Sequence, residues 1–524
     1  MYRRQFMAGV AGALALPSIA RAADRQVIKF VPAADVPSLD PVWTSASQTR
    51  DHAMMVYDTL YGLDDALQPL PQMVEGHVVA DDGRRWTLTL RSGLKFHDGA
   101  AVLGRDCVAS IQRWGKRDSF GQALLAVTDE ISAPDDKTIV FRLKYPFAQL
   151  PNALGKTSGP CVIMPERLAR TDSFTAVTDP TGSGPFKLKL DERVPGARMV
   201  WEKFDGYVPR PDGVPQGSSG PKIAYFNRVE WLMMPDGATA SSALQRGEVD
   251  WLRWPLVDLL PQLRRAPGVA VRVIEPVGLI GTLRFNHLQP PFDNPAVRRA
   301  IVPALSQADY MNAANGEDSS LWHDKVGYFT PGTPMASDVG MAALTAPRDM
   351  AAARKALVES GYKGERTVVM SPSDFPIYTA MADVTGQLLK EVGFNVDVQS
   401  MDWATAMQRR ARPEPVDQGG WSVFHTGWGG GEEVNPVANI WLRGNGKAAA
   451  PGWPTSPRIE TLRDAWLRAV DPAEQKRLCA EIQGQAFVDL PYVPLGQMFA
   501  PVAYRVDLVG MVQGLPAFWN IRRG

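Results

Sequence analysis

The sequence predicts an α/β protein built from more than one domain. Two segments alternate strand, helix and strand, one from Val229 to Leu252 and one from Arg366 to Val398. Such a connection returns the chain in the same direction, so the second strand runs parallel to the first. The chain has 524 residues, too many for a single hydrophobic core, and a prior of about 150 residues per domain gives roughly two to four domains.

The stretch from Trp86 to Trp114 predicts a smaller α+β unit. Residues 86–90 alternate apolar and polar side chains, the period of a half-buried strand. Asp82-Gly83 and Asp98-Gly99 supply turns because glycine accepts a positive φ. Apolar residues then recur at helical spacing between Cys107 and Trp114. Residues 137–144 alternate again and add a strand to the same sheet.

The remaining elements follow from the same two periodicities and from glycine and proline at their ends. The expected strands cover residues 26–31, 229–233, 249–252, 366–370 and 394–398. The expected helices cover residues 47–61, 239–246 and 381–392, with two more that begin at Pro295, capped by Asn294 or Asp293, and at Pro472.

Composition excludes several classes of function. With 45% hydrophobic and 21% charged residues the chain is an ordinary globular protein, and 56 basic against 56 acidic residues leave no charge to attract nucleic acid or an anionic membrane. The six histidines and three cysteines lack metal-ligand spacing, and no catalytic or phosphate-binding motif occurs. We therefore expect no enzyme, metal or cofactor. The cysteines are interpreted as small core residues, although a disulfide between Cys161 and Cys479 stays open.

The first 22 residues have the form of an export signal. Arg3-Arg4 precede an apolar run, and Ala20-Arg21-Ala22 is a signal-peptidase site. The arginine pair favours the twin-arginine route, and an ordinary Sec signal remains an alternative. Because no cysteine precedes Cys107, no lipid anchor is expected. The mature chain, cleaved near Ala22, is therefore predicted to be a soluble periplasmic protein.

Several stretches resemble the extracellular solute-binding proteins of family 5, the peptide-binding receptors of ABC importers. From Gly83 to Asp106 the chain matches the family pattern "DG..W.F.LR.G.KFHDG" and the helix that follows it. Residues 38–41 (SLDP), 179–188 (DPTGSGPFKL) and 282–301 (TLRFNHLQPPFDNPAVRRAI) match three further family segments. Leu103 departs from the pattern because the family usually has a helix-capping Thr or Asn there, so another group must cap this helix.

The resemblance implies a periplasmic-binding-protein type II-like fold of two lobes with an additional small α+β domain. Lobe I would comprise residues 23–56, 180–273 and 489–524, the accessory domain residues 57–179, and lobe II residues 274–488. A monomer of this kind captures a peptide or peptide-like solute between its lobes and delivers it to an ABC permease and ATPase complex in the inner membrane.

Tryptophan and glycine mark a candidate binding site between residues 403 and 453. Trp403, Trp421 and Trp428 offer large rigid faces, and Gly429-Gly430-Gly431 lets a ligand approach the backbone. Core packing is the alternative for each tryptophan, and we prefer it for Trp441 and Trp453. Around Trp428 the chain resembles the family motif "x-G-W-x-A-D", which implies a wall of the ligand cavity.

The aspartate of this motif, which in peptide binders pairs with the α-amino group of the substrate, is missing here. Glu432 and Glu433 either replace it or are solvated, and His425 is either a carboxylate partner or a structural residue. The resemblance also makes Asp35 a candidate ligand contact, with a solvated loop acid as the alternative. The predicted ligand-binding residues are therefore Asp35, Trp403, Trp421, His425, Trp428, Gly429, Glu432 and Glu433.

Three other functions stay open at this point. The same fold can bind a non-peptide ligand such as a metal chelate, haem, glutathione or an opine, which His425 and the glutamate pair would suit. A secreted hydrolase of peptides or cell-wall fragments and a chaperone that grips apolar segments belong to other classes.

Overall fold

The computed structural model describes residues 26–44 and 46–524. The expected export signal lies outside these residues. The chain forms two compact units: the first contains the residues up to 142, 150–274 and 501–524, and the second contains residues 143–149 and 275–500. Among the described helices, none is long and apolar enough to cross a membrane.

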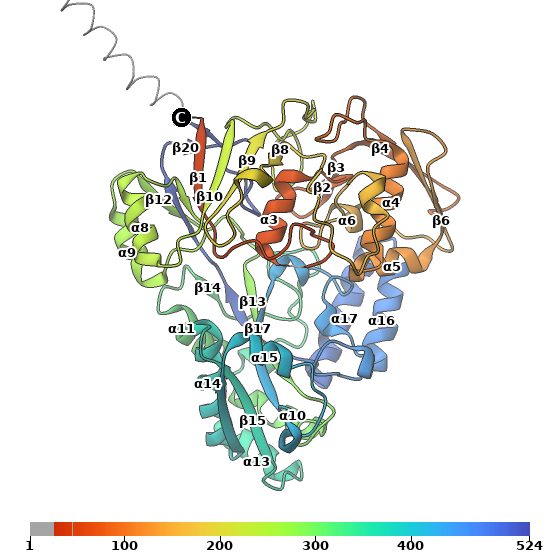
Figure 1. The fold of residues 1–524 in the computed structure, drawn as a ribbon. Coiled ribbons are helices and arrows are strands. Elements are labelled where there is room, and N and C mark those ends of the chain that lie inside the picture. Colours follow the sequence, from red (N-terminus) through yellow and green to blue (C-terminus); the bar gives the residue numbers. More distant parts are fainter. Residues whose placement is uncertain (1–25, 45) are drawn as a thin grey trace, which may run out of the picture. The chain divides into compact units, whose positions relative to one another are not determined.

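The first unit is built on a seven-stranded sheet with the strand order β12-β19-β11-β1-β10-β9-β8. Strand β1 runs parallel to both β10 and β11 and lies between them, as the predicted crossover requires. Figure 1 shows the red first strand inserted beside the later strand β10. The bounds are β1 Val27–Val31, β8 Phe186–Leu188, β9 Arg198–Lys203, β10 Arg228–Leu232, β11 Trp251–Leu252, β12 Val269–Arg272 and β19 Val502–Arg505, with helices α3 Ser47–Val56, α8 Gly237–Arg246 and α9 Leu260–Arg265.

The core of this sheet is aromatic. The ring of Phe30 in β1 lies 5.3 Å from Trp231, 5.0 Å from Trp251 and 5.2 Å from Phe518, measured between ring centroids. All four side chains are fully buried. The last segment of the chain therefore completes the core that the first strand begins.

A four-stranded antiparallel sheet with the order β4-β5-β7-β6 forms the predicted α+β part of the same unit. The turn between β4 and β5 places Asp82 and Gly83 at positive φ, and β5 pairs with β7 in register Trp86↔Phe141. The helix cap that Leu103 cannot supply comes from Asp106, whose Oδ2 accepts the Leu103 backbone N–H at 2.8 Å. The bounds are β2 Tyr61–Leu63, β3 Pro69–Pro71, β4 Val74–Ala80, β5 Arg85–Leu90, β6 Thr128–Ser132 and β7 Thr138–Leu143, with α4 Gly104–Gly115, α5 Ser119–Val127 and α7 Glu166–Ala169.

The chain passes between the seven-stranded sheet and the α+β part twice, near Asp58 and near Ser183, and these two segments contact each other. Two of the family motifs, KFHDG and DPTGSGPFKL, meet at this place. His97 of the KFHDG segment accepts the Gly182 N–H at Nδ1 (3.2 Å), and its Nε2 lies 3.0 Å from the Gly184 carbonyl oxygen. A Cβ on Gly182 would lie 2.0 Å from the Val56 carbonyl oxygen, which explains why glycine is needed. The two motifs therefore contact each other and hold two distant chain segments together.

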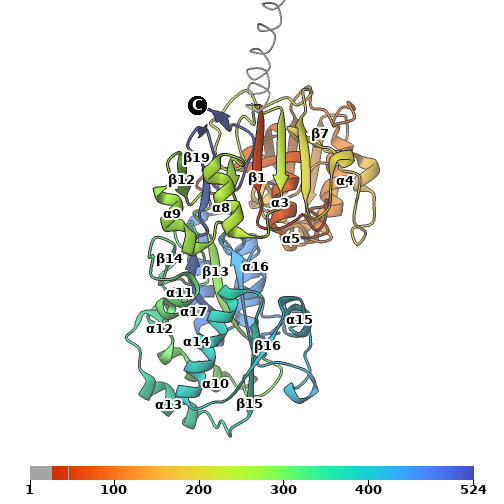
Figure 2. The same ribbon diagram turned by 60° about the vertical axis from the view of Figure 1, so that its left-hand side comes forward.

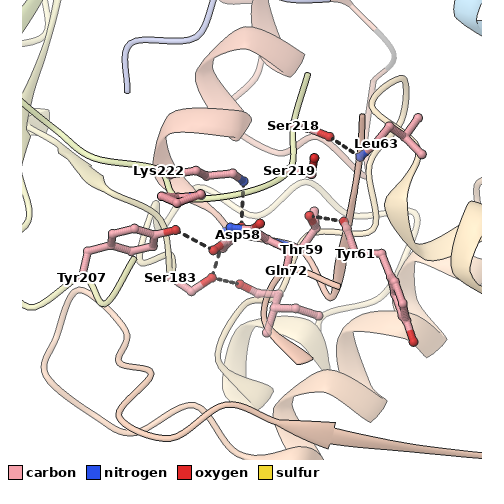
Figure 3. A network of polar contacts seen from close by, with 12 residues as sticks. Asp58, Thr59, Tyr61, Leu63, Gln72, Ser183, Tyr207, Ser218, Ser219 and Lys222 are labelled. Carbon is pink, nitrogen blue, oxygen red and sulfur yellow. Dashed lines mark hydrogen bonds and ion pairs between the residues drawn. The ribbon is translucent and has the colours of Figure 1, made fainter. Parts of the chain in front are cut away.

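A buried ion pair holds the same crossing together, and Figure 3 shows its polar network. The Asp58 carboxylate contacts Lys222 Nζ at 2.8 Å and accepts the Tyr207 hydroxyl at 2.8 Å. The Asp58 N–H donates to Ser183 Oγ at 3.0 Å, which links the two segments directly. Asp58 is 1% exposed and Lys222 is completely buried, and this pairing keeps the pKa of Asp58 below its ordinary value despite burial.

The second unit is built on a six-stranded mixed sheet with the order β14-β18-β13-β17-β15-β16. The predicted crossover forms its edge, because β15 and β16 pair in parallel and α14 packs against both; Figure 2 shows this arrangement. The strands are β13 Leu279–Phe285, β14 Trp322–His323, β15 Arg366–Pro372, β16 Asn395–Met401, β17 Val423–Gly429 and β18 Val493–Met498. The main helices are α10 Pro295–Ala300, α11 Gln307–Asn315, α13 Met350–Glu359, α14 Pro376–Val392, α15 Trp403–Arg409, α16 Pro457–Arg468 and α17 Pro472–Asp489.

Three details differ from the sequence-based expectations. The first helix ends at Val56 rather than at residue 61, because Tyr61 begins strand β2. The chain remains in the second unit through Ala500 instead of leaving it at residue 489, since β18 pairs with β13 and β14. The three cysteines are buried free thiols, so Cys161 and Cys479 form no disulfide.

The substitution Lys222→Met tests the importance of the buried pair. It leaves the Asp58 carboxylate buried without its cation, which should lower the free energy of unfolding by about 3–5 kcal/mol. Urea unfolding followed by circular dichroism at neutral pH measures this loss. Because pairing lowers the pKa of Asp58, the stabilisation is present above the unfolded-state pKa and is lost as the pH falls through the folded-state value.

The matched control is Lys187→Met. Lys187 pairs with Glu202 at 3.8 Å at the surface, where an ion pair contributes only about 0–1 kcal/mol. Equal losses in the two variants would contradict a special role for the buried pair.

Candidate functional site

Most of the predicted site residues lie on β17 or in the turn that follows it. β17 pairs antiparallel with β13, with Trp428 opposite Ile280 and Gly429 opposite Leu279. A single 3-10 turn, Gly430–Glu432, ends the strand. Because side chains alternate along a strand, neighbouring site candidates on β17 point to opposite faces of the sheet.

One face of β17 is covered by α14 and contains His425 and Gly427. His425 Nε2 lies 2.8 Å from the Thr385 hydroxyl of α14, which in turn lies 2.8 Å from the Tyr310 hydroxyl. The imidazole is 2% exposed, and burial lowers its pKa to about 3. His425 is therefore a neutral interior residue at neutral pH, and the structure favours its structural interpretation over a role as a charged partner for a carboxylate.

The opposite face carries Trp428, packed against Trp441 with ring centroids 5.1 Å apart. Arg284 of β13 lies 4.4 Å above the Trp441 ring and donates to the carbonyl oxygens of Trp441, Ala450 and Pro451. Trp428 is half-buried, and its indole N–H has no hydrogen-bond partner among the described residues. The result is an aromatic wall with an unsatisfied donor, held rigidly from behind by a buried guanidinium.

The other two tryptophan candidates have different environments. Trp421 is completely buried, contacts Phe424 edge to face and donates its indole N–H to the Arg410 carbonyl oxygen at 3.1 Å. It is a core residue here. Trp403, half-buried at the start of α15, stacks on Tyr378 at 5.1 Å. The Tyr378 hydroxyl accepts the Gly427 N–H at 3.0 Å, so one side chain connects Trp403 to the strand that carries Trp428.

The three consecutive glycines have different surroundings: Gly430 is closely packed, and Gly429 and Gly431 border open space. A Cβ on Gly430 would lie 1.9 Å from the Val277 carbonyl oxygen, so no other residue fits there. Gly429 and Gly431 have no atom within 4 Å of the position of a Cβ. Their backbone is therefore open to approach, as the sequence analysis expected of Gly429.

The two glutamates that follow the turn also differ. Glu432 is half-buried and interacts within the described chain. Glu433 is 1% exposed, and neither of its carboxyl oxygens has a hydrogen-bond partner among the described residues. Burial and the charge of Glu432 raise the pKa of Glu433 well above its ordinary value, although the neighbouring Tyr492 hydroxyl favours the ionised form. Glu433 is thus a buried carboxyl without a cation, not the solvated residue of the alternative interpretation.

Asp35 belongs to the first unit. Its carboxyl oxygens accept the backbone N–H groups of Val36 and Gly196, both at 2.7 Å. It therefore joins two loops of that unit and is only partly buried. In the same loop Asp40 forms two hydrogen bonds with Arg113, at 3.1 and 2.7 Å, so the SLDP segment is fixed to α4.

Sequence reasoning missed Arg284, Tyr492 and Tyr378, which build the surroundings of Trp428 and Glu433 from other elements. A signal existed for Arg284, because a charged residue interrupts the apolar run of β13 (LIGTLRF). Tyr378 and Tyr492 carry no such signal in the sequence. Within the described part of the chain, no cluster of three or more His, Cys, Asp or Glu side chains is arranged to hold a metal ion.

Comparison with known proteins places the chain among receptors for solutes. The sequence model for "Bacterial extracellular solute-binding proteins, family 5 Middle" matches residues 68–449. A probable peptide ABC transporter periplasmic-binding protein of Sinorhizobium fredii is 36% identical, over 99% of each chain.

Two solved structures share the fold. The PBP AgaA in complex with agropinic acid, from A. tumefacien R10, has a TM-score of 0.78 and 20% identity, covering 95% of this chain and 99% of its own. The periplasmic binding protein DppA of Helicobacter pylori in complex with the peptide STSA has a TM-score of 0.76 and 22% identity, covering 95% of this chain and 98% of its own.

The glycine run yields a prediction with a built-in control. Gly430→Ala forces a methyl group against the Val277 carbonyl and should lower the free energy of unfolding by about 1–3 kcal/mol or more. Gly431→Ala, one residue away and without neighbours at Cβ, should change it by no more than about 1 kcal/mol. Chemical denaturation of both variants measures the difference, and equal stabilities would show that the turn adjusts.

The substitution Glu433→Gln tests whether the buried acid is neutral. Because the folded-state pKa is raised above the ordinary 4.5, the folded protein holds the proton more tightly, and stability falls as the pH rises above that value. The amide cannot ionise, so the variant should be more stable than the parent at pH 7, with the gain shrinking toward pH 4. Thermal unfolding across this pH range tests the trend; a gain that does not depend on pH would contradict it.

Proposed function

Because the chain belongs to the bacterial extracellular solute-binding proteins of family 5, we propose that it captures a peptide or peptide-like solute in the periplasm. It then delivers this solute to an ABC permease and its ATPase in the inner membrane, and it acts as a monomer exported by the signal in residues 1–22. The relative in Sinorhizobium fredii, which carries the name of a peptide transporter component, supports this assignment.

The structural observation that carries the proposal is the wall formed by Trp428, the open glycines and Glu433. A half-buried indole face suits an apolar side chain, and the open space beside Gly429 and Gly431 suits the close approach of a main chain. The buried carboxyl of Glu433 suits a cationic group. An amino group, an extended backbone and an apolar side chain are the parts of a peptide.

We propose the contact residues accordingly. Trp428, Gly429, Glu432 and Glu433 form the main wall, with Trp403 supporting it through Tyr378. Trp421 and His425 are omitted because their side chains are buried and already bonded within the second unit.

A small organic acid is the second candidate solute. The unpartnered indole N–H groups of Trp428 and Trp441 are donors that suit a carboxylate or carbonyl oxygen, and agropinic acid is bound by a structural neighbour. Native mass spectrometry of the protein purified from its own periplasm weighs whatever is bound and separates a peptide from such an acid.

The substitution Trp428→Ala tests the wall. It removes one face of the proposed site and should weaken the solute identified by mass spectrometry at least tenfold, about 1.4 kcal/mol, without loss of the fold. Titration calorimetry measures the affinity, and circular dichroism checks the fold. Trp428→Phe retains an aromatic face without the N–H, and Phe174→Ala removes an exposed aromatic ring from the first unit. Affinity unchanged in Trp428→Ala would exclude this residue from the site.

A further inference from the structure

The backbone of Glu433 is held in place by hydrogen bonds from Thr330. The Thr330 N–H donates to the Glu433 carbonyl oxygen at 3.1 Å, and the Thr330 hydroxyl donates to the Gly430 carbonyl oxygen at 2.6 Å. Both ends of the turn are therefore attached to the same residue. This attachment leaves the side chain of Glu433, rather than its backbone, as the part that can move.

The polar groups around the Glu433 carboxyl supply no cation, and among them the Tyr492 hydroxyl alone favours the ionised form. Arg284 donates its N–H groups to three carbonyl oxygens. The Asn439 amide donates to the Tyr328 carbonyl oxygen at 3.1 Å and to the Tyr492 hydroxyl at 2.9 Å. The titratable and charged groups facing Glu433 are Glu432 on its own turn and Tyr492 ahead of β18, with Tyr328 and Arg284 behind Tyr492. None of these supplies a cation to the carboxyl.

An isolated ionised carboxylate in such a place would be costly, because its charge leaves water without a compensating partner. The same carboxyl as a neutral acid avoids most of that cost. This is the direction in which burial and Glu432 shift the pKa of Glu433. Two residues earlier, Gly431 has no atom within 4 Å of the position of a Cβ, so the space beside the chain is open there.

We propose that Glu433 is a neutral carboxylic acid in the empty protein and ionises when the ammonium group of a solute contacts it, so that capture releases one proton. The proposal deepens the proposed function and rests on it, because it requires a solute with an amino group. The O–H bond of Glu433 breaks and its proton passes to water. The solute arrives already protonated, and its N–H groups donate to the new carboxylate without any change in its covalent bonds.

The sign of the resulting pH dependence is fixed. Below the pKa of Glu433 in the empty protein, each captured solute releases a proton, so affinity rises with pH by up to about tenfold per unit. The rise in affinity ends where the amino group of the solute loses its proton, at about pH 8 for a free α-amino group. A peptide with an acetylated amino group should show neither the rise nor the release of a proton.

The infrared carbonyl band of a protonated carboxyl group tests the proposal on the full mature chain. The probes are a peptone digest and the same digest after acetylation of its amino groups, with thermal shift as an independent measure of binding. The variants are Glu433→Gln and, as a matched control, Glu317→Gln, which changes an exposed glutamate of the same unit outside the proposed site.

The expected result is a protonated-carboxyl band at neutral pH in the empty protein and in Glu317→Gln that is absent from Glu433→Gln. Addition of the digest removes the band, and addition of the acetylated digest does not. Absence of the band from the empty protein overturns the proposal. So does a band that persists while the digest raises the melting temperature, a result that leaves solute capture intact. A digest that changes neither band nor melting temperature contradicts peptide capture itself, and this inference with it.

Discussion

Burial of charge is the constraint on which both units depend. In the first unit Asp58 and Lys222 are removed from water together, and the hydrogen bonds from Tyr207 and Thr59 fill the remaining positions on the carboxylate. A buried pair adds little net stability over apolar residues, but either charge without the other is strongly unfavourable. The pair therefore enforces one particular crossing of the segments that join the α+β part to the seven-stranded sheet.

Glu433 in the second unit is the exception to this pattern. Asp40 has Arg113, Asp58 has Lys222, and the buried guanidinium of Arg284 has three carbonyl oxygens. Glu433 is as deeply buried and has no such partner among the described residues. Strongly perturbed acids without a structural partner concentrate at functional sites, and this one follows directly after the open glycine turn. Whether a buried charged group has a partner inside the protein thus distinguishes Asp40, Asp58 and Arg284 from Glu433.

Features that depend on neighbouring residues in the sequence could be predicted, and features that depend on contacts between distant residues could not. The parallel unit from Arg366 to Met401 and the hairpin around Asp82-Gly83 were predictable, because periodicity and turn residues act locally. Trp428 and Glu433 entered as candidates through the resemblance to a short family motif, and they stay predictions. The error on His425 arose because β17 alternates, and only the packing of α14 decides which face is closed. Tyr378 and Tyr492 reach the site by tertiary packing, which no local pattern encodes.

The unsatisfied groups also bear on how the site binds. Buried donors and acceptors without partners reduce the stability of the empty fold, and around the proposed site they include the indole N–H groups of Trp428 and Trp441 and the carboxyl of Glu433. Arg284 holds Trp441 in place, and Thr330 holds the turn that precedes Glu433, so little ordering is required when a solute arrives. A solute that presents a cation and an acceptor restores the missing hydrogen bonds without that entropic cost. The unsatisfied groups destabilise the empty protein, and a solute that satisfies both kinds of group binds more tightly for this reason. A solute that lacks either group does not gain this affinity.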